Sequence, residues 1–106
     1  MNSLNQIILE GENVRVIKDN NSLFAFLLEV KRTFKNANGE MVEEISNFEV
    51  ENWAGLAEVC RRMCNVGRGV RIVGRLKQNR WEDDMGIMKT KVVVISEHIE
   101  FKPYLK

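Results

Sequence analysis

A single segment of this chain has the apolar spacing of an α-helix: Trp53-Ala54-Gly55-Leu56-Ala57-Glu58-Val59-Cys60-Arg61-Arg62-Met63-Cys64-Asn65. The residues expected on its inner face recur at intervals of three and four, and they are Leu56, Cys60, Met63 and Cys64. Arg61 and Arg62 point to the opposite side, and Gly67 follows as a helix-stop signal. The pattern predicts one helix, which begins at Trp53.

Segments typical of β-strands lie on both sides of this helix. Those before it cover residues 7–9, continued by 14–18 after a break at Gly11, then 23–34 and 42–52, with polar turns at 19–22 and 36–39. After it, a half-buried strand is indicated by Val70, Ile72 and Leu76, which alternate with Arg71, Val73, Arg75 and Lys77. A loop is expected over residues 81–86 and a last strand over 89–101.

Three strands, one helix and two further strands are the element order of the five-stranded OB barrel. We therefore predict an all-β fold, a five-stranded OB-fold barrel with one helix between strands 3 and 4. Because no linker or internal repeat interrupts the sequence, residues 1–106 are expected to form a single domain.

The composition is that of an ordinary globular protein. Of the 106 residues, 44% are hydrophobic and 29% are charged, which excludes a disordered chain, a collagen-like fibre and a disulfide-stapled miniature. No run of about eighteen apolar residues indicates a membrane span, and the first residues lack the pattern of a signal peptide. Cys60 and Cys64 are too few for a disulfide framework, so we expect a reducing, cytoplasmic setting.

No cluster in the sequence has the make-up of a catalytic or metal site. Cys60 and Cys64 share a helix face, but zinc takes four ligands and His98 is the only other obvious one, so burial as small apolar side chains is the better interpretation. The adjacent carboxylates Glu43-Glu44 and Asp83-Asp84 face opposite ways on a strand. We therefore expect no enzymatic activity, no metal and no cofactor.

Charge is distributed unevenly, although the net charge is only +1. The charged residues between positions 36 and 60 are all acidic, whereas most of those from 61 to 91 are basic, and a second basic group of Lys31, Arg32 and Lys35 adjoins Phe34. Cations interleaved with aromatic rings are typical of a groove for single-stranded nucleic acid, where cations contact phosphates and rings stack on bases. The candidate rings are Phe34, Trp53 and Trp81. The alternative is that the arginines form the solvent face of a strand.

Four segments carry a resemblance to a known family. They are Phe34-Lys35-Asn36-Ala37-Asn38-Gly39-Glu40, Asn52-Trp53-Ala54-Gly55-Leu56-Ala57-Glu58, Val70-Arg71-Ile72-Val73-Gly74-Arg75-Leu76 and Asn79-Arg80-Trp81-Glu82-Asp83 with Gly86. Their order and spacing resemble those of the bacterial single-stranded DNA-binding proteins, whose corresponding motifs include FGKLAE, V-x-V-x-G-x-L and R-x-W-x-D…G. The resemblance implies an OB-fold subunit, usually a homotetramer, that wraps single-stranded DNA during replication, recombination and repair.

Matched residue by residue, the resemblance implies base stacking by Phe34, Trp53 and Trp81. It places family cations near the DNA path at Lys77, Arg80 and Lys89. With the neighbouring basic residues, the predicted nucleic-acid-binding set is Phe34, Trp53, Trp81, Lys31, Arg32, Lys35, Arg75, Lys77, Arg80 and Lys89.

The chain departs from the family pattern on the third predicted strand. Asn47 stands where the family has a stacking tryptophan, Glu49 replaces a residue that is often basic, and Glu51 replaces an apolar one. By strand alternation these residues share a face with Trp53. Acidic side chains would then lie beside the phosphate path, and we expect them to weaken binding or to confine it to a different track.

The last residues, Phe101-Lys102-Pro103-Tyr104-Leu105-Lys106, are basic where family members commonly carry an acidic tip. We therefore expect no recruitment of replication enzymes through an acidic tail. A short OB protein of this kind also resembles the primosomal replication proteins, so the alternative function is a protein-interaction module with weak nucleic-acid binding. RNA suits the same groove chemistry as DNA, and the sequence does not separate the two.

A homo-oligomer is expected, and the family resemblance favours a tetramer over a dimer. An open barrel would leave strand edges that pairing between subunits could cover. The apolar residues 7–9 of the first strand suit that pairing.

Overall fold

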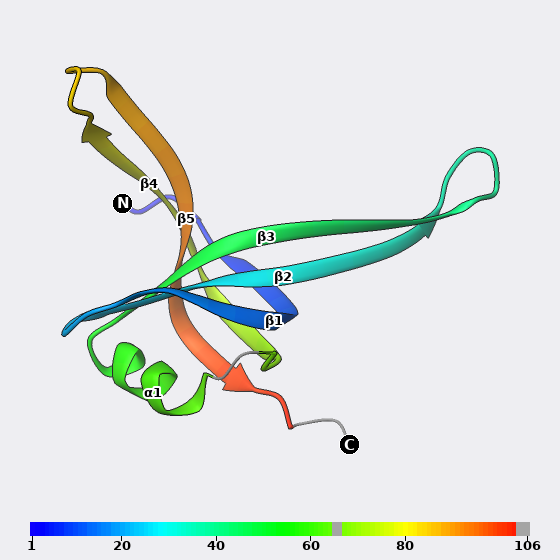
Figure 1. Ribbon diagram of the computed structural model, residues 1–106, viewed down its shortest axis with the longest axis horizontal. Helices are drawn as coiled ribbons and strands as arrows, with labels where there is room; N and C mark the ends of the chain where they lie inside the picture. Colours follow the sequence, from blue (N-terminus) through cyan, green and yellow to red (C-terminus); the bar gives the residue numbers. More distant parts are fainter. Residues whose placement is uncertain (65–66, 104–106) are drawn as a thin grey trace.

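The computed structural model describes residues 1–64 and 67–103 (Figure 1). Its elements are, in chain order, β1 (Ile7–Asp19), β2 (Leu23–Lys35), β3 (Met41–Trp53), α1 (Gly55–Met63), β4 (Val70–Glu82) and β5 (Met88–Phe101). The strands form a closed barrel in the order β1-β2-β3-β5-β4, and β3 pairs with β5 in parallel. The predicted all-β architecture, with the helix between the third and fourth strands, is confirmed.

The core is built from one face of each strand. β2 and β3 pair without a register break from Leu23 opposite Trp53 to Lys35 opposite Met41. Side chains alternate between the two faces of a strand, so Phe24, Phe26 and Leu28 all point inward, and each is at most 3% exposed. Among the described residues, the buried cluster includes Val14, Phe24, Phe26, Leu28, Val50, Ala57, Cys60, Cys64, Val70, Ile72 and Val94.

The helix begins later than the sequence pattern predicts. Trp53 is the last residue of β3, and α1 starts at Gly55. Between them Ala54 has φ 53° and ψ −120°. A residue with a Cβ adopts a positive φ of this kind only under strain, whereas glycine adopts it freely. The amide of Ala54 donates to the carbonyl of Ser22, which ties this corner to the β1–β2 turn. The sharp turn at Ala54 therefore keeps Trp53 in the strand.

The inner face of the helix differs from the prediction at three positions. Ala57 is buried together with Cys60 and Cys64, whereas Leu56 is only partly buried and Met63 is 39% exposed. Positions 57, 60 and 64 repeat at the helical period, so the buried face centres on them. The burial of both free cysteines confirms their interpretation as apolar packing residues. A hydrogen bond between the two thiols raises the pKa of Cys60, which burial raises further, and lowers the pKa of Cys64.

Two hairpins extend from the barrel as arms, β2–β3 toward the right of Figure 1 and β4–β5 toward its upper left. Each arm ends in a turn that an acidic or amide side chain organises. Asn36 Oδ1 accepts from the amides of Asn38 and Glu40, both at 3.0 Å, and Asp83 Oδ1 accepts from Met85 and Ile87, both at 2.9 Å. β4 runs to Glu82, so the loop predicted over 81–86 begins later, and Trp81 is a strand residue.

β4 leaves the barrel core after Gly74. At that position the register against β5 shifts, and an added Cβ would collide with the carbonyl oxygen of Ile95. The core includes Val70 and Ile72 from this strand, but Leu76 is 42% exposed, so its predicted burial is wrong. The reason is length, because a strand of 13 residues continues beyond the core into the arm.

The barrel is closed where the sequence suggested an open edge. Ile7, Ile8 and Leu9 pair with Gly74, Val73 and Ile72 of β4. The second half of β1 pairs with β2 instead, after a register shift between Glu12 and Arg15. The closed barrel corrects the expectation of an open one, and one edge of residues 7–9 is used by β4. Pairing between subunits through this segment stays a prediction.

Candidate nucleic-acid interface

Both tryptophans are exposed to the same degree, 45% each. Trp53 is the last residue of β3, and Trp81 lies near the end of β4. The side chain of Glu51 joins the two strands, because its Oε1 accepts from Trp53 Nε1 at 3.1 Å and its Oε2 accepts from Asn79 Nδ2 at 3.0 Å. Asn79 and Trp81 are two residues apart and therefore share a face of β4. The two indoles thus belong to one continuous polar surface.

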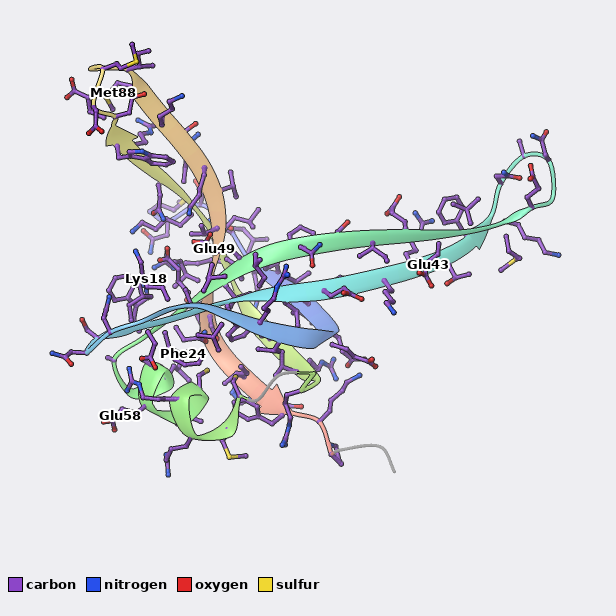
Figure 2. The ribbon with its side chains drawn as sticks, viewed as in Figure 1. Lys18, Phe24, Glu43, Glu49, Glu58 and Met88 are labelled. Carbon is purple, nitrogen blue, oxygen red and sulfur yellow. The ribbon has the colours of Figure 1, made fainter. Side chains whose placement is uncertain are left out.

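The two acidic residues of β3 nearest the tryptophans, Glu49 and Glu51, have hydrogen-bond partners within the chain. Glu51 is only 6% exposed and is occupied by its two hydrogen bonds. Glu49, which lies where β3 passes β5 (Figure 2), accepts a hydrogen bond from Lys91 Nζ at 2.9 Å. One carboxylate is therefore buried and the other is paired, and the effect of these acids on DNA binding stays a prediction.

Three of the predicted cations are on the same face as the tryptophans. Arg75 and Lys77 precede Asn79 and Trp81 at alternate positions of β4, and Lys89 is directly opposite Trp81 in the β4–β5 pairing. Lys89 Nζ lies 3.8 Å from Asp83 Oδ2, and Arg75 Nε lies 3.9 Å from Glu97 Oε2. These long, exposed pairs contribute little to stability, so both cations can turn to a phosphate at low cost.

The β2–β3 arm divides its predicted residues between two faces. Lys31 and Lys35 share the face of Asn47, Glu49 and Glu51, since they pair opposite odd-numbered residues of β3. Lys31 Nζ also lies 3.5 Å from Glu29 Oε1. These two lysines extend the tryptophan face along the arm.

Phe34, Arg32 and Arg80 are not brought together with the tryptophans. Phe34 pairs opposite Val42 and Arg32 opposite Glu44, on the other face of the arm, with the guanidinium carbon 4.9 Å from the centre of the phenyl ring. Arg80 alternates with Trp81 and donates to Gln78 Oε1 at 2.9 Å. The ten predicted residues therefore fall into two groups on opposite faces.

Sequence reasoning missed Asn79 and Lys91 as members of this surface. Asn79 stands directly opposite Lys91 in the β4–β5 pairing, and both contact acids of β3. The alternation of β4 could have indicated Asn79, because it lies two residues before Trp81. Nothing in the sequence pairs these residues with Glu49 and Glu51, since the contacts cross between strands far apart in the chain.

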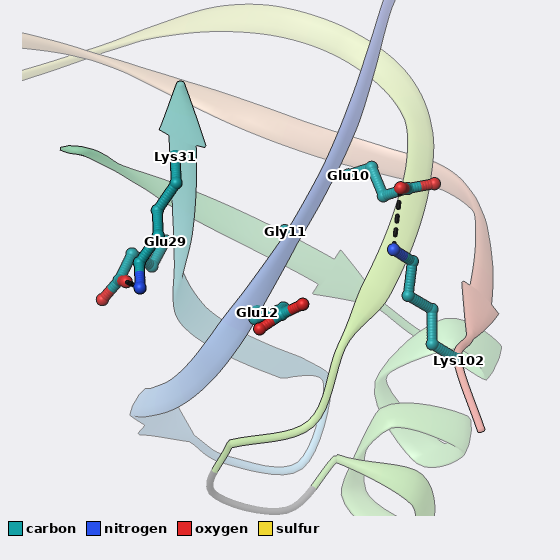
Figure 3. A pocket seen from close by; sticks show the side chains of 6 residues that line it. All are labelled: Glu10, Gly11, Glu12, Glu29, Lys31 and Lys102. Atoms are coloured by element: carbon teal, nitrogen blue, oxygen red, sulfur yellow. Dashed lines mark hydrogen bonds and ion pairs between the residues drawn. The ribbon is translucent and has the colours of Figure 1, made fainter. Parts of the chain in front are cut away.

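A separate shallow pocket of about 170 Å³ lies between β1, β2 and the chain after β5 (Figure 3). Glu10, Gly11, Glu12, Glu29, Lys31 and Lys102 line it. Lys102 Nζ donates to Glu10 Oε1 at 2.7 Å, and this contact, together with the positive charge of the lysine, lowers the pKa of Glu10. The lining has no aromatic ring, so this pocket does not supply base stacking.

Other candidate chemistry is sparse in the described part of the chain. Residues 1–64 and 67–103 contain no group of three or more His, Cys, Asp or Glu side chains that could hold a metal ion. His98 is exposed, with its Nε2 3.3 Å from Glu100 Oε1. Within those same residues no helix is long and apolar enough to cross a membrane.

Comparison with known proteins yields one consistent result. A family model described as "Single-strand binding protein family" matches residues 4–102. A single-stranded DNA-binding protein of Aquifex aeolicus is 36% identical over 70% of this chain, and single-stranded DNA-binding protein 1 of Chlorobaculum tepidum is 29% identical over 76% of it. The structure of the Plasmodium falciparum SSB in complex with ssDNA superposes with a TM-score of 0.81 at 18% identity and covers 97% of this chain and 98% of that one, which confirms the predicted OB barrel.

The matches cover 50% of the Aquifex protein and 53% of the Chlorobaculum protein, so the chain spans about half the length of these relatives. The family model, by contrast, covers nearly all of the present sequence. The closed five-stranded barrel agrees with that match. This chain belongs to the single-strand binding protein family.

Proposed function

We propose that this protein binds single-stranded DNA without sequence preference, by stacking bases on Trp53 and Trp81 and by neutralising phosphates with the cations around them. The observation that carries the proposal is the joint exposure of the two indoles, each 45% exposed, on one face linked through Glu51 and Asn79. Exposed aromatic rings beside cations suit stacking, because every base has a π-face. Membership of the family supports the same function.

The proposed path runs along β4 and β5 and out over the β2–β3 arm. Arg75, Lys77 and Lys89 flank the tryptophans, and Lys31 and Lys35 continue the positive charge along the arm. Phe34, Arg32 and Arg80 lie on the other faces of the two arms. They would contact the DNA only if it continued from the tryptophan face around an arm. The Plasmodium falciparum SSB, a protein of similar fold, is in complex with ssDNA, which supports single-stranded DNA as the ligand.

The departures at Glu49 and Glu51 do not favour the alternative of a protein-interaction module. Both acids have partners within the chain, as described above. The wider role that we propose is the one typical of the family, protection of single strands in replication, recombination and repair. It is proposed for one non-enzymatic OB domain over residues 1–106, in the reducing cytoplasm that its two free cysteines suit.

We further propose a homo-oligomer, with a tetramer favoured over a dimer. Ile8, Val16 and Ile17 of β1 are 60%, 44% and 45% exposed, and burial of such apolar side chains against another subunit would favour association. Light scattering of the purified protein tests the assembly. A monomer at all concentrations would contradict the proposal.

The function is tested by tryptophan fluorescence during titration with a long oligothymidine, at low and moderate salt. Binding through the proposed surface should quench the emission, and the affinity should fall steeply as salt rises, because phosphate neutralisation releases counterions. An oligouridine titration compares DNA with RNA. No quenching and no binding at low salt would overturn the proposed function.

A further inference from the structure

Glu51 carries a charged group that is almost fully buried, although it lies between the two exposed tryptophans of the proposed binding surface. It is 6% exposed, although an ionised side chain is costly to bury unless hydrogen bonds replace its water. Both oxygens are satisfied, one by the Trp53 indole N–H and the other by the Asn79 amide. None of the ion pairs among the described residues involves Glu51, so these two neutral donors are what hold it.

The bond to Trp53 restricts the ring rather than covering it. The indole can donate only through Nε1, so a bond of 3.1 Å to a fixed carboxylate selects one orientation of the ring. The side chain nevertheless remains 45% exposed. Hydrogen bonds to an ionised acceptor are stronger than neutral ones, which makes the restriction effective in a half-exposed position.

The bond to Asn79 anchors the carboxylate to a second strand. β3 and β4 are not neighbours in the barrel, because β5 lies between them. The Glu51–Asn79 contact therefore bridges across β5 and connects the corner at Trp53 with the strand segment that carries Trp81. A side chain held at both oxygens is a rigid support for the indole.

We propose that Glu51, braced by Asn79, is a positioning residue that fixes the Trp53 indole in the orientation used for base stacking. The inference rests on the proposed function and deepens it. An indole that is already ordered loses less conformational freedom when a base stacks on it, which strengthens binding. Glu51 itself does not contact the DNA.

The positioning role and simple electrostatics predict opposite changes in DNA affinity when the carboxylate is removed. Removal of a carboxylate near a phosphate path should strengthen DNA binding if only charge matters. Removal of a positioning carboxylate should weaken it. Glu43 provides a matched control, since it lies on the same face of β3, far out along the arm (Figure 2), and is exposed.

The experiment compares oligothymidine affinity, by fluorescence anisotropy of a labelled strand, for the full chain and its variants Glu51→Leu, Glu51→Gln and Glu43→Leu. We expect Glu51→Leu to weaken binding about five-fold, as for one side chain that must be ordered on binding. Glu43→Leu, which removes the same charge, should bind at least as tightly as the unaltered chain. Glu51→Gln should keep the affinity of the unaltered chain. The amide oxygen of the glutamine can still accept from Trp53 Nε1, and its N–H can donate to the oxygen of a rotated Asn79 amide.

Two further measurements separate positioning from general support of the fold. In the background of Trp53→Ala, Glu51→Leu should cause no additional loss, whereas a loss that persists there would overturn the inference. In the free protein, the indole N–H resonance of Trp53 should shift in Glu51→Leu and remain in place in Glu51→Gln. If Glu51→Leu fails to fold, Asn79→Ala replaces it, and unchanged affinity in that folded variant would count against the inference.

The outcomes distinguish this inference from the proposed function. If the unaltered chain does not bind oligothymidine, the proposed function fails, and the indole resonance still reports whether Glu51 orients Trp53. If the unaltered chain binds and Glu51→Leu binds equally or more tightly, the proposed function stands and the positioning role is wrong.

Discussion

Lys91 Nζ donates a hydrogen bond of 2.9 Å to Glu49 Oε1, from the first part of β5 to the second half of β3. The pair is half-exposed, with 48% of the lysine side chain and 20% of the glutamate side chain accessible. It lies on the same face as the two tryptophans, so the acid holds a cation that the phosphate path could otherwise use. Pairs of this exposure contribute at most about 1 kcal/mol, and a phosphate can compete for the lysine.

Glu49→Gln should therefore strengthen binding to oligothymidine and make it more salt-dependent. With Lys91 released, one more phosphate contact is available, and the slope of log affinity against log salt should become more negative by about 0.7. Affinities measured at several salt concentrations give this slope. In the double variant Glu49→Gln/Lys91→Gln the gain should disappear, and a gain that survives there would show that Lys91 is not its source.

Trp81→Ala should weaken binding to oligothymidine by about 1–3 kcal/mol, the usual loss for one stacked base. Phe34→Ala should cost less, because Phe34 is on the opposite face of its arm under the Arg32 guanidinium. Anisotropy titrations of both variants at one salt concentration provide the comparison. An equal or larger loss for Phe34→Ala would mean that the DNA follows the other face.

Ala54→Gly should stabilise the protein by about 1 kcal/mol. Ala54 holds φ 53° and ψ −120°, where a Cβ is strained and glycine is not. Ala37 is a matched control, because it lies in the exposed turn after β2 without a positive φ. Ala37→Gly should lower the stability of the protein slightly, because glycine increases the conformational entropy of the unfolded chain. Urea unfolding at one protein concentration measures both changes. A loss of stability for Ala54→Gly would show that the corner is not strained.

The Glu10–Lys102 contact should make stability depend on pH at the acidic end. Lys102 lowers the pKa of Glu10 below its ordinary value of 4.5, so the folded state binds this proton less readily than the unfolded state. The contact therefore stabilises the protein fully above pH 4.5, and the contribution is lost as the pH falls through the lower pKa of the folded state.

An NMR titration of the Glu10 carboxyl tests this linkage. Lys102→Met should move the pKa of Glu10 up toward 4.5 and reduce the acid sensitivity of the unfolding free energy. A Glu10 pKa that does not respond to Lys102→Met would refute the contact as its cause.

The fold could be predicted largely because its signals are local. The strands expected over residues 23–34 and 42–52, the turn over 36–39 and the helix expected from Trp53 depend on residues close in the chain. The structure has each of them within two residues of its expected bounds. The corner at Ala54 was not predictable in this way, since its left-handed backbone contradicts the ordinary preference of alanine. For that reason the helix starts at Gly55 and not at Trp53, where the sequence pattern predicts it.

The sequence by itself determined the apolar run over residues 23–34 that forms β2 and the element order that implies the barrel. Only the tertiary structure decided how the surface side chains group. Contacts such as Glu51–Asn79 and Glu49–Lys91 join residues 28 and 42 positions apart, and no local pattern specifies them. The same closure of the barrel that buries Glu51 turns an acid expected to oppose DNA into a support for Trp53, because its charge meets two donors there instead of solvent.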